Sequence, residues 1–261
     1  MNRKISSYLS LAMSLSLFVL IWWVIARTVN NPSMVASPES AWNEFARLFT
    51  NPGLRSQLTS GVQTTLGSIF LGFALSVVVG VPLGILMGRY LVADLFLEPW
   101  VNSWYSIPAI AFVPLTMNWT GITWVSAMIT AFLVTVFSIT INVYTGVKNC
   151  SRSLVESALS YGASQRQIMY KIILPASLPS TMTGLRLGIS RAIEGVIIAE
   201  MVFTVVGLGG MIDASADKLQ LALSYSLIAV LAVICITLSE LMKFLSGKVL
   251  VWKESQALAR T

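Results

Sequence analysis

The residues of this chain that could do chemistry gather in one apolar segment, at about 183–206, which carries four charged side chains: Arg186, Arg191, Glu194 and Glu200. A charge near the centre of a bilayer costs about 2.5–3.5 kcal/mol, so each of these side chains should face a partner or water. Arg191 and Glu194 are three residues apart and can pair along a helix, whereas Arg186 lies near one end and can snorkel to the interface. Glu194 is therefore the best candidate for lining a polar pathway across a membrane, and the alternative is a structural salt bridge between helices.

Several kinds of catalytic and binding site are excluded by what the sequence lacks. It contains no histidine, which rules out a histidine-ligated haem or zinc and a Ser-His-Asp triad. It contains no phosphate-binding loop of the Gly-x-x-x-x-Gly-Lys-Ser/Thr type, because its only Gly-Lys pair, Gly247-Lys248, lacks the upstream glycine. The two cysteines, Cys150 and Cys235, are expected in a loop and in the middle of a span, where a disulfide would not form. The sequence therefore predicts neither an enzyme nor a metal site, and any ATP must be bound by another chain.

The composition predicts an all-α protein that crosses a membrane several times. Of 261 residues 56% are hydrophobic and 11% are charged, with a mean hydropathy of +0.78, more apolar surface than a soluble domain of this size can bury. Arg3 and Lys4 precede an apolar run to Ala26 that is too long for a cleaved signal peptide and indicates a signal anchor. Six transmembrane helices are expected, of which the third is the shortest: about 9–26, 64–88, 101–118, 122–146, 183–206 and 221–245. The glycine-rich stretch 207–210 is expected to be a loop.

The basic residues predict the orientation of these spans. With both termini in the cytoplasm, eleven lysines and arginines lie on the inner side and four lie outside, in agreement with the positive-inside rule. The tryptophans fit this arrangement, since Trp22, Trp23, Trp119 and Trp124 mark the outer interface and Trp100, Trp104 and Trp252 the inner one. The net charge of +6 is explained by these cytoplasmic loops rather than by binding of nucleic acid.

The segment 28–63 is expected to lie outside the membrane and to contain a short helix. Ser37 followed by Pro38 is typical of a helix start. Downstream, Trp42, Phe45, Leu48 and Phe49 share one helical face. This face predicts a helix that lies on the outer membrane surface or one that packs against the bundle, and the sequence leaves both open.

The span 64–88 carries a small residue at every fourth position, namely Ser68, Gly72, Ser76, Gly80, Gly84 and Gly88. Such a stripe lets another helix approach to backbone contact. The second helix could belong to a second copy of the chain, which would make the stripe a homodimer seam, or to the same chain. Pro82 within this helix is expected to kink it.

The polar segment 148–182 predicts a rigid helix-turn-helix in the cytoplasm. Residues Leu154 to Ser160 can form one helix, and Gly162 permits the left-handed turn that ends it. Ser164 and Gln167 have the spacing of a capping box that begins a second helix. Pro175 and Pro179 are expected to keep this helix separate from the following span.

These residues resemble the docking loop of type I ABC-importer permeases. The loop motif is Glu156-Ser157-Ala158, then Gly162-Ala163-Ser164, then Ile173-Leu174-Pro175. Further matches to the nitrate/sulfonate/taurine subgroup run through residues 60–210 in the right order, including Gly80-Val81-Pro82-Leu83-Gly84, Ile107-Pro108, Thr183-Gly184-Leu185-Arg186, Ala199-Glu200-Met201 and Gly207-Leu208-Gly209.

The resemblance implies a permease subunit in the bacterial inner membrane, with the type I permease fold. Two copies, as a homodimer, would form the pore, two cytoplasmic ATPases carrying ATP and Mg would grip the loop, and an external binding protein would deliver the solute. The residues implied in ATPase coupling are Glu156, Ser157, Ala158, Gly162, Ala163, Ser164, Arg166, Leu174 and Pro175; those expected along the translocation pathway are Arg191, Glu194 and Glu200.

The resemblance leaves the solute open between a small nitrate-, sulfonate- or taurine-like compound and a neutral or cationic heterocycle. Glu194 departs from the subgroup pattern, and a central carboxylate would repel an oxyanion unless Arg191 neutralises it. An ion-coupled secondary transporter that uses Glu194 and Glu200 is the alternative function.

The expected organisation is a signal anchor and periplasmic segment at 1–63, the permease domain at 64–250 with its coupling loop at about 148–182, and a cytoplasmic tail at 251–261.

Overall fold

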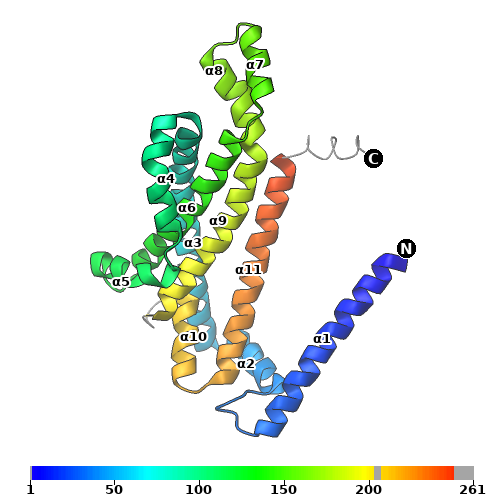
Figure 1. The fold of residues 1–261 in the computed structure, drawn as a ribbon. Coiled ribbons are helices and arrows are strands. Elements are labelled where there is room, and N and C mark those ends of the chain that lie inside the picture. The colour runs from blue at the N-terminus through cyan, green and yellow to red at the C-terminus, as the bar shows by residue number, and fades with distance from the viewer. Residues whose placement is uncertain (1, 203–206, 250–261) are drawn as a thin grey trace.

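The computed structural model describes residues 2–202 and 207–249, and these residues form helices without any strand. Figure 1 shows the helices as an elongated bundle, with α7 and α8 at one end and α2 and α10 at the other. The elements in chain order are α1 (Asn2–Val29), α2 (Pro38–Thr50), α3 (Pro52–Arg89), α4 (Leu91–Tyr105), α5 (Ala109–Thr120), α6 (Trp124–Lys148), α7 (Arg152–Ser160), α8 (Gln165–Ile168), a π-helical turn (Met169–Ile173), α9 (Leu174–Val202), α10 (Gly207–Asp217) and α11 (Leu221–Val249). Trp252 and the expected tail 251–261 lie outside the described residues.

Three described helices, α3, α6 and α11, are long and apolar enough to cross a membrane. The helical run Gln165–Val202 and α10, bent by 42° relative to each other, meet the same criteria only when taken together, as a broken span or a re-entrant segment. Within α1, Met13–Val29 is an apolar helical stretch. Figure 1 shows α1 diverging from the bundle, which it meets near its C-terminal end: the Trp22 indole donates to the carbonyl of Ala36 at 2.9 Å and its ring packs edge-on against Tyr225 of α11.

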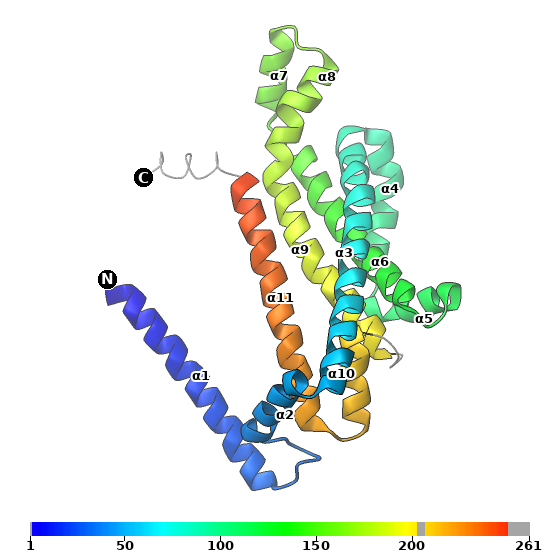
Figure 2. The ribbon, with the colours of Figure 1, turned by 180° about the vertical axis from the view of Figure 1, so that it is seen from behind.

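The centre of the bundle consists of α3, α6 and α9, which lie side by side in both Figure 1 and Figure 2. Small residues allow this close approach. A Cβ atom at Gly84 of α3 would lie 2.6 Å from the carbonyl oxygen of Thr140 in α6, and one at Gly195 of α9 would lie 2.9 Å from the Cα of Ala131. Helices that meet through glycine gain backbone-level van der Waals contact without needing a hydrophobic driving force between them.

The stripe on α3 packs within the chain and is therefore not the homodimer seam considered from the sequence. Ser76 donates a hydrogen bond to the carbonyl of Phe132 at 3.2 Å, and a Cβ at Gly72, Gly80 or Gly88 would likewise come within 3 Å of α6 atoms. Because α6 covers the stripe along its length, no second copy can reach it in this arrangement.

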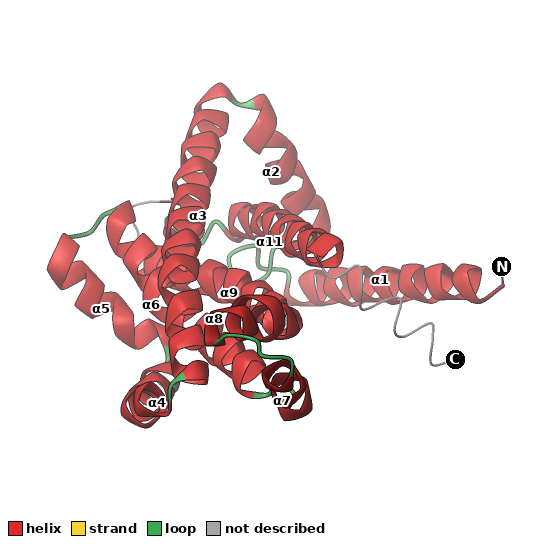
Figure 3. Ribbon diagram, turned by 90° about the horizontal axis from the view of Figure 1, so that it is seen from above, coloured by secondary structure: helices red, strands yellow, loops and turns green. Residues whose placement is uncertain are grey.

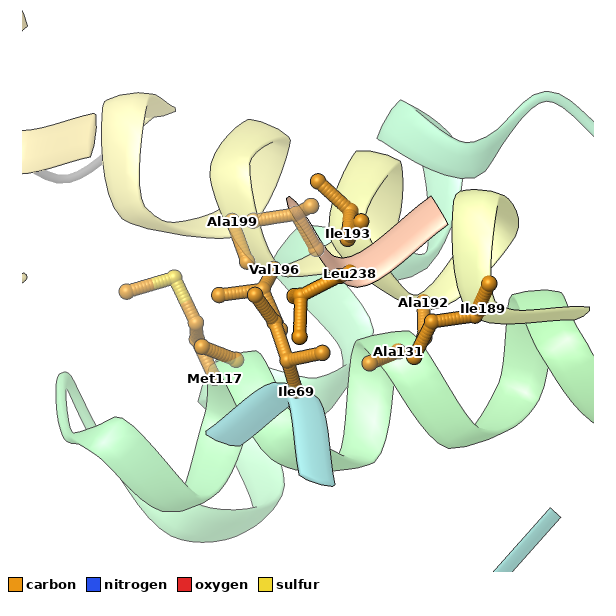
Figure 4. Packing of buried hydrophobic residues seen from close by; sticks show 11 residues of the cluster. Ile69, Met117, Ala131, Ile189, Ala192, Ile193, Val196, Ala199 and Leu238 are labelled. Atoms are coloured by element: carbon orange, nitrogen blue, oxygen red, sulfur yellow. The ribbon is translucent and has the colours of Figure 1, made fainter. Parts of the chain in front are cut away.

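The largest buried apolar cluster joins these three helices to α5 and α11. Figure 4 shows Ile69 of α3, Ala131 of α6 and Val196 of α9 meeting near Leu238 of α11, with Met117 of α5 at one side. Seen from the α7 end, α5 and α1 extend from opposite sides of the bundle (Figure 3). This cluster therefore packs the middle of α9, residues 189–199, against α3 and α6.

The prediction of a single span at 101–118 is wrong. The helix is interrupted at residues 106–108, since α4 ends at Tyr105 and α5 begins at Ala109. Pro108 has no backbone N–H to donate and disfavours helical geometry at Ile107 before it, which favours a helix end at this point. Hydropathy, which is high on both sides, does not register such a break.

The helix expected after Ser37 is confirmed, since the Ser37 hydroxyl accepts a hydrogen bond from the Ser40 N–H and α2 begins at Pro38. Leu48 is fully buried in a cluster with residues of α3, α10 and α11, whereas Trp42 and Phe49 are exposed. The helix thus packs on the bundle with one part of its apolar face and leaves the other part open.

Two further expectations about helix ends are wrong. Pro175 and Pro179 do not separate the second helix of the loop from the next span, because α8, the π-helical turn and α9 follow one another without a break. The Leu174 N–H donates to the carbonyl of Met169, five residues back, and this wider turn accommodates the proline ring that follows. Residues 207–210 form the first turn of α10 rather than a loop.

Candidate functional site

A cavity of about 510 Å³ opens where the break between α4 and α5 faces α6 and α9. Its wall includes Trp104, Tyr105 and Phe112 together with Arg191 and Glu194 of α9. Residues 106–108, which form the break, are among those that line this space. Two of the three charged residues expected along a pathway therefore line one cavity.

The pair predicted between Arg191 and Glu194 is confirmed. The Nη1 of Arg191 lies 2.9 Å from Oε2 of Glu194, and both side chains are 44% exposed. Because the residues are one helical turn apart on α9, the helix itself holds the two charges at this spacing. Partial exposure leaves further hydrogen-bonding positions on both groups open to the cavity.

The aromatic rings of Trp104 and Phe112 also line the cavity. The indole of Trp104 stacks on Phe112 with ring centroids 5.8 Å apart and on Phe137 at 6.0 Å. The sequence missed this role of Trp104, which we expected at the inner membrane interface. The signal that could have revealed it is the Ile107-Pro108 pair, which ends the helix one turn later.

Glu200 lies apart from this cavity, in a buried junction of α3, α9 and α10. Both of its carboxylate oxygens accept from the Thr65 hydroxyl at 2.9 Å, and Oε2 also accepts from the Gly209 N–H at 2.9 Å. The Leu208 N–H donates in turn to the Thr65 oxygen at 2.9 Å. The carboxylate and the hydroxyl therefore satisfy N–H groups that the first turn of α10 would otherwise leave unpaired.

Glycine is required beside this carboxylate. Gly207 has a φ of +80°, and a Cβ there would lie 2.0 Å from Oε1 of Glu200, while one at Gly209 would lie 2.7 Å from the Glu200 Cβ. The glycine-rich stretch that we expected to form a loop is thus the close-packed start of a helix. Thr65, its other partner, carried no signal in the sequence.

The second candidate site is the helical hairpin of α7 and α8, the hairpin being residues 152–175. As predicted, α7 ends at a left-handed glycine, Gly162, with φ of +78°. The Ala163 N–H donates to the Ala158 carbonyl at 3.0 Å and the Gly162 N–H to the Leu159 carbonyl at 2.9 Å, which together form a Schellman motif. This turn fixes the angle between the two helices.

The capping box that begins α8 is also confirmed. The Gln167 N–H donates to the Ser164 hydroxyl at 3.3 Å, and the Ser164 N–H donates to the Gln167 side chain at 2.8 Å. Both ends of the turn are therefore closed by specific hydrogen bonds, which makes the hairpin an ordered element rather than a flexible loop.

Buried isoleucines attach the hairpin to the spans. Ile168 and Ile173 are buried in a cluster with Val143 and Val147 from the end of α6. Arg89, at the end of α3, donates a hydrogen bond to Gln165 of α8. The hairpin is thus held to the ends of α6 and α3, and it runs directly into α9.

The outer surface of the hairpin exposes large apolar side chains next to a carboxylate. Leu154, Leu159 and Tyr161 are 53%, 47% and 93% exposed, and Glu156 is exposed between them. Of the residues implied in coupling, exposed positions are occupied by Glu156, Ser157, Gly162, Ser164, Arg166 and Pro175, and partly buried ones by Ala158, Ala163 and Leu174. Exposed large apolar side chains gathered on one short element are compatible with a protein interaction surface.

A charged contact beside the hairpin was not foreseen from the sequence. The Lys148 ammonium at the end of α6 lies 2.9 Å from Oδ2 of Asp94 in the first turn of α4. This hydrogen bond, helped by Tyr144, lowers the pKa of the Asp94 carboxyl despite its burial. Asp94 therefore ties α4, whose other end lines the cavity, to the helix on which the hairpin is seated.

Comparison with known proteins identifies this arrangement of helices. Residues 80–250 match the family described as binding-protein-dependent transport system inner membrane component. The chain belongs to this family. It is the permease component of an ABC importer and a multi-pass inner-membrane protein.

Related permeases carry names that point to small organic solutes. The taurine transport system permease protein TauC of Escherichia coli is 26% identical over 92% of this permease and 88% of its own length. The formylaminopyrimidine transport permease protein ThiX of Halalkalibacterium halodurans is 31% identical over 74% of this permease and 75% of its own length.

Solved structures share the fold. The permease resembles a chain of the MetNI methionine ABC transporter in an inward-facing conformation, with a TM-score of 0.66, 19% identity, and coverage of 76% of this permease and 99% of that chain. The type I permease fold expected from the sequence is thereby confirmed.

Proposed function

We propose that this permease forms the translocation pathway of an ATP-driven importer and docks cytoplasmic ATPases through its hairpin. The observation that carries the proposal is the hairpin itself, a doubly capped element that presents Leu154, Leu159 and Tyr161 to solvent beside Glu156. Tyrosine is one of the three residue types, with tryptophan and arginine, that are enriched among the residues that dominate binding energy at protein interfaces.

The fold supplies a route from the hairpin to the cavity. The π-helical turn joins α8 to α9 without a break, and Arg191 lies 17 residues beyond Leu174 on that helix, about 26 Å at 1.5 Å per residue. Displacement of the hairpin by a partner would therefore move the charged pair as part of one helix. ATP and Mg would be held by the partner, since the sequence has no phosphate-binding loop.

The proposal includes the other partners and the orientation expected from the sequence. The hairpin and both termini lie in the cytoplasm, a solute-binding protein delivers substrate at the opposite face, and a second copy of the permease completes the pore as a homodimer. Arg191 and Glu194 line the pathway, whereas Glu200 positions α10. The hydrogen bonds that already occupy the Glu200 carboxylate favour this role over the ion-coupling role that the sequence left open.

Replacement of the most exposed hairpin residue tests the proposal. Tyr161→Ala should abolish most ATP-dependent uptake into proteoliposomes that hold the permease with its ATPase and binding protein, because an interface tyrosine contributes about 2 kcal/mol or more to binding. Tyr90→Ala is the matched control, since Tyr90 is 59% exposed at the same end of the bundle but lies outside the hairpin. Equal uptake by the two variants would contradict docking at the hairpin.

A further inference from the structure

We propose that the cavity between the α4–α5 break and α9 takes a small solute of zero net charge that carries a cationic end and an anionic end. This inference rests on the proposed function, since it assumes that the cavity lies on the translocation pathway. It narrows the substrate class, which the family and the sequence leave open between anions, cations and neutral compounds.

The charges of the cavity wall carry the inference. Arg191 and Glu194 are the ionised side chains among the described residues that line the cavity, and their charges sum to zero. Their charged atoms are 2.9 Å apart, so an anion that approaches the guanidinium also approaches the carboxylate, and the repulsion offsets much of the attraction. The same reasoning disfavours a net cation.

A zwitterion does not meet this conflict. Its anionic end can take hydrogen bonds from Arg191 while its cationic end donates to Glu194, so that each charge of the pair gains a partner of opposite sign. Both side chains are 44% exposed, which leaves room for such contacts without breaking the pair. The bidentate shape of the guanidinium suits a planar or tetrahedral oxyanion group such as a carboxylate or sulfonate.

The remaining wall of the cavity is partly apolar. Trp104 stacks on Phe112 and Phe137, and Ile107 and Ile110 add apolar surface. A cavity of about 510 Å³ is large enough for a small organic molecule.

The test compares two probes of nearly equal shape, 2-aminoethanesulfonate and 2-hydroxyethanesulfonate. The first is a zwitterion, and the second is a net anion in which a hydroxyl replaces the ammonium group. The reporter is the thiol introduced by Ser106→Cys in the cavity wall, in the permease with Cys150 and Cys235 changed to serine, and the readout is its rate of alkylation by a maleimide. Ser151→Cys, exposed at the start of the hairpin, is the control whose alkylation should not respond to either probe.

The zwitterion should protect the reporter thiol at about tenfold lower concentration than the anion, the difference expected for one hydrogen bond between charged groups. Adding Glu194→Gln should remove or reverse this preference, because Arg191 then leaves the cavity with a net positive charge. Equal or better protection by the anion in the parent protein would overturn the inference, and so would an absence of protection by the zwitterion.

Failure of this inference can be separated from failure of the proposed function. If the anion protects better while ATPase retention still depends on the hairpin, the substrate class is wrong and the importer assignment stands. If the ATPase is not retained through the hairpin, the proposed function fails whatever the probes do.

Discussion

The turn at Gly162 offers a prediction in which only the backbone changes. Gly162 has a φ of +78°, and a Cβ added there would meet no heavy atom within 4 Å outside its chain neighbours. Substitution therefore introduces no steric clash with another element, and its cost comes from the left-handed conformation alone. Replacement by asparagine, alanine and valine forms a graded series, since asparagine tolerates this conformation and a β-branched residue tolerates it least.

The expected magnitude follows from that conformation. An ordinary L-residue pays about 1–2 kcal/mol in the left-handed region, which lowers the equilibrium constant for the native turn by about 5- to 30-fold. Valine should reach or exceed the upper end of this range, and asparagine should stay near glycine. The spans should remain folded, because the buried cluster around Ile168 and Ile173 does not involve Gly162.

The assay is uptake per ATP hydrolysed in proteoliposomes that contain the permease, its ATPase and its binding protein. The ratio should fall in the order glycine, asparagine, alanine, valine, while size-exclusion profiles of the purified variants stay unchanged. A valine variant with the parental ratio would refute the claim that the hairpin geometry transmits motion. An asparagine variant as poor as valine would show that side-chain bulk at the docking surface matters instead of the backbone.

Three further predictions concern the helices that carry the sites, each measured by thermal unfolding of the purified permease in detergent. Gly84→Ala should lower the free energy of unfolding by about 1–3 kcal/mol, because its methyl group would lie 2.6 Å from a carbonyl oxygen of α6. The control Gly67→Ala meets no atom within 4 Å and should be neutral or slightly stabilising, and equal unfolding midpoints for the two variants would contradict the packing of α3 on α6. Thr65→Val should destabilise by about 1–3 kcal/mol, since it leaves the Leu208 N–H of α10 and Oε1 of Glu200 without a partner, and an unchanged midpoint would argue against that junction. The pKa of Asp94 is lower in the folded protein than in the unfolded chain, where it is about 4, so the ion pair with Lys148 contributes its full stability above about pH 4 and loses it as the pH falls through the lowered pKa. Asp94→Asn should therefore be less stable than the parent at neutral pH and equal to it in acid, and a pH-independent difference would refute the argument.

The features predicted correctly from the sequence depend on one or two turns of chain. The capping box of Ser164 and Gln167, the left-handed turn at Gly162 and the pair of Arg191 with Glu194 need only residues three or four positions apart. At this range the helix geometry alone decides which groups meet, so spacing is sufficient evidence.

The features that the sequence did not reveal depend on distant parts of the chain. The stretch 207–210 begins α10 because the Glu200 carboxylate and the Thr65 hydroxyl accept hydrogen bonds from N–H groups of its first turn. The small-residue stripe of α3 could have met any helix, and only the tertiary structure shows that it meets α6. Pro175 lies within a continuous helical run because a π-helical turn precedes it, which no proline rule predicts.

The central claim is that the hairpin holds the ATPase, and co-purification tests it most directly. The tagged permease, expressed with its neighbouring genes, would be purified as the parent, as Glu156→Lys and as Glu240→Lys, a control at an exposed acidic residue of α11. The account predicts that an ATPase is retained by the parent and by the control and is lost from Glu156→Lys. Retention by all three, or by none, would contradict it.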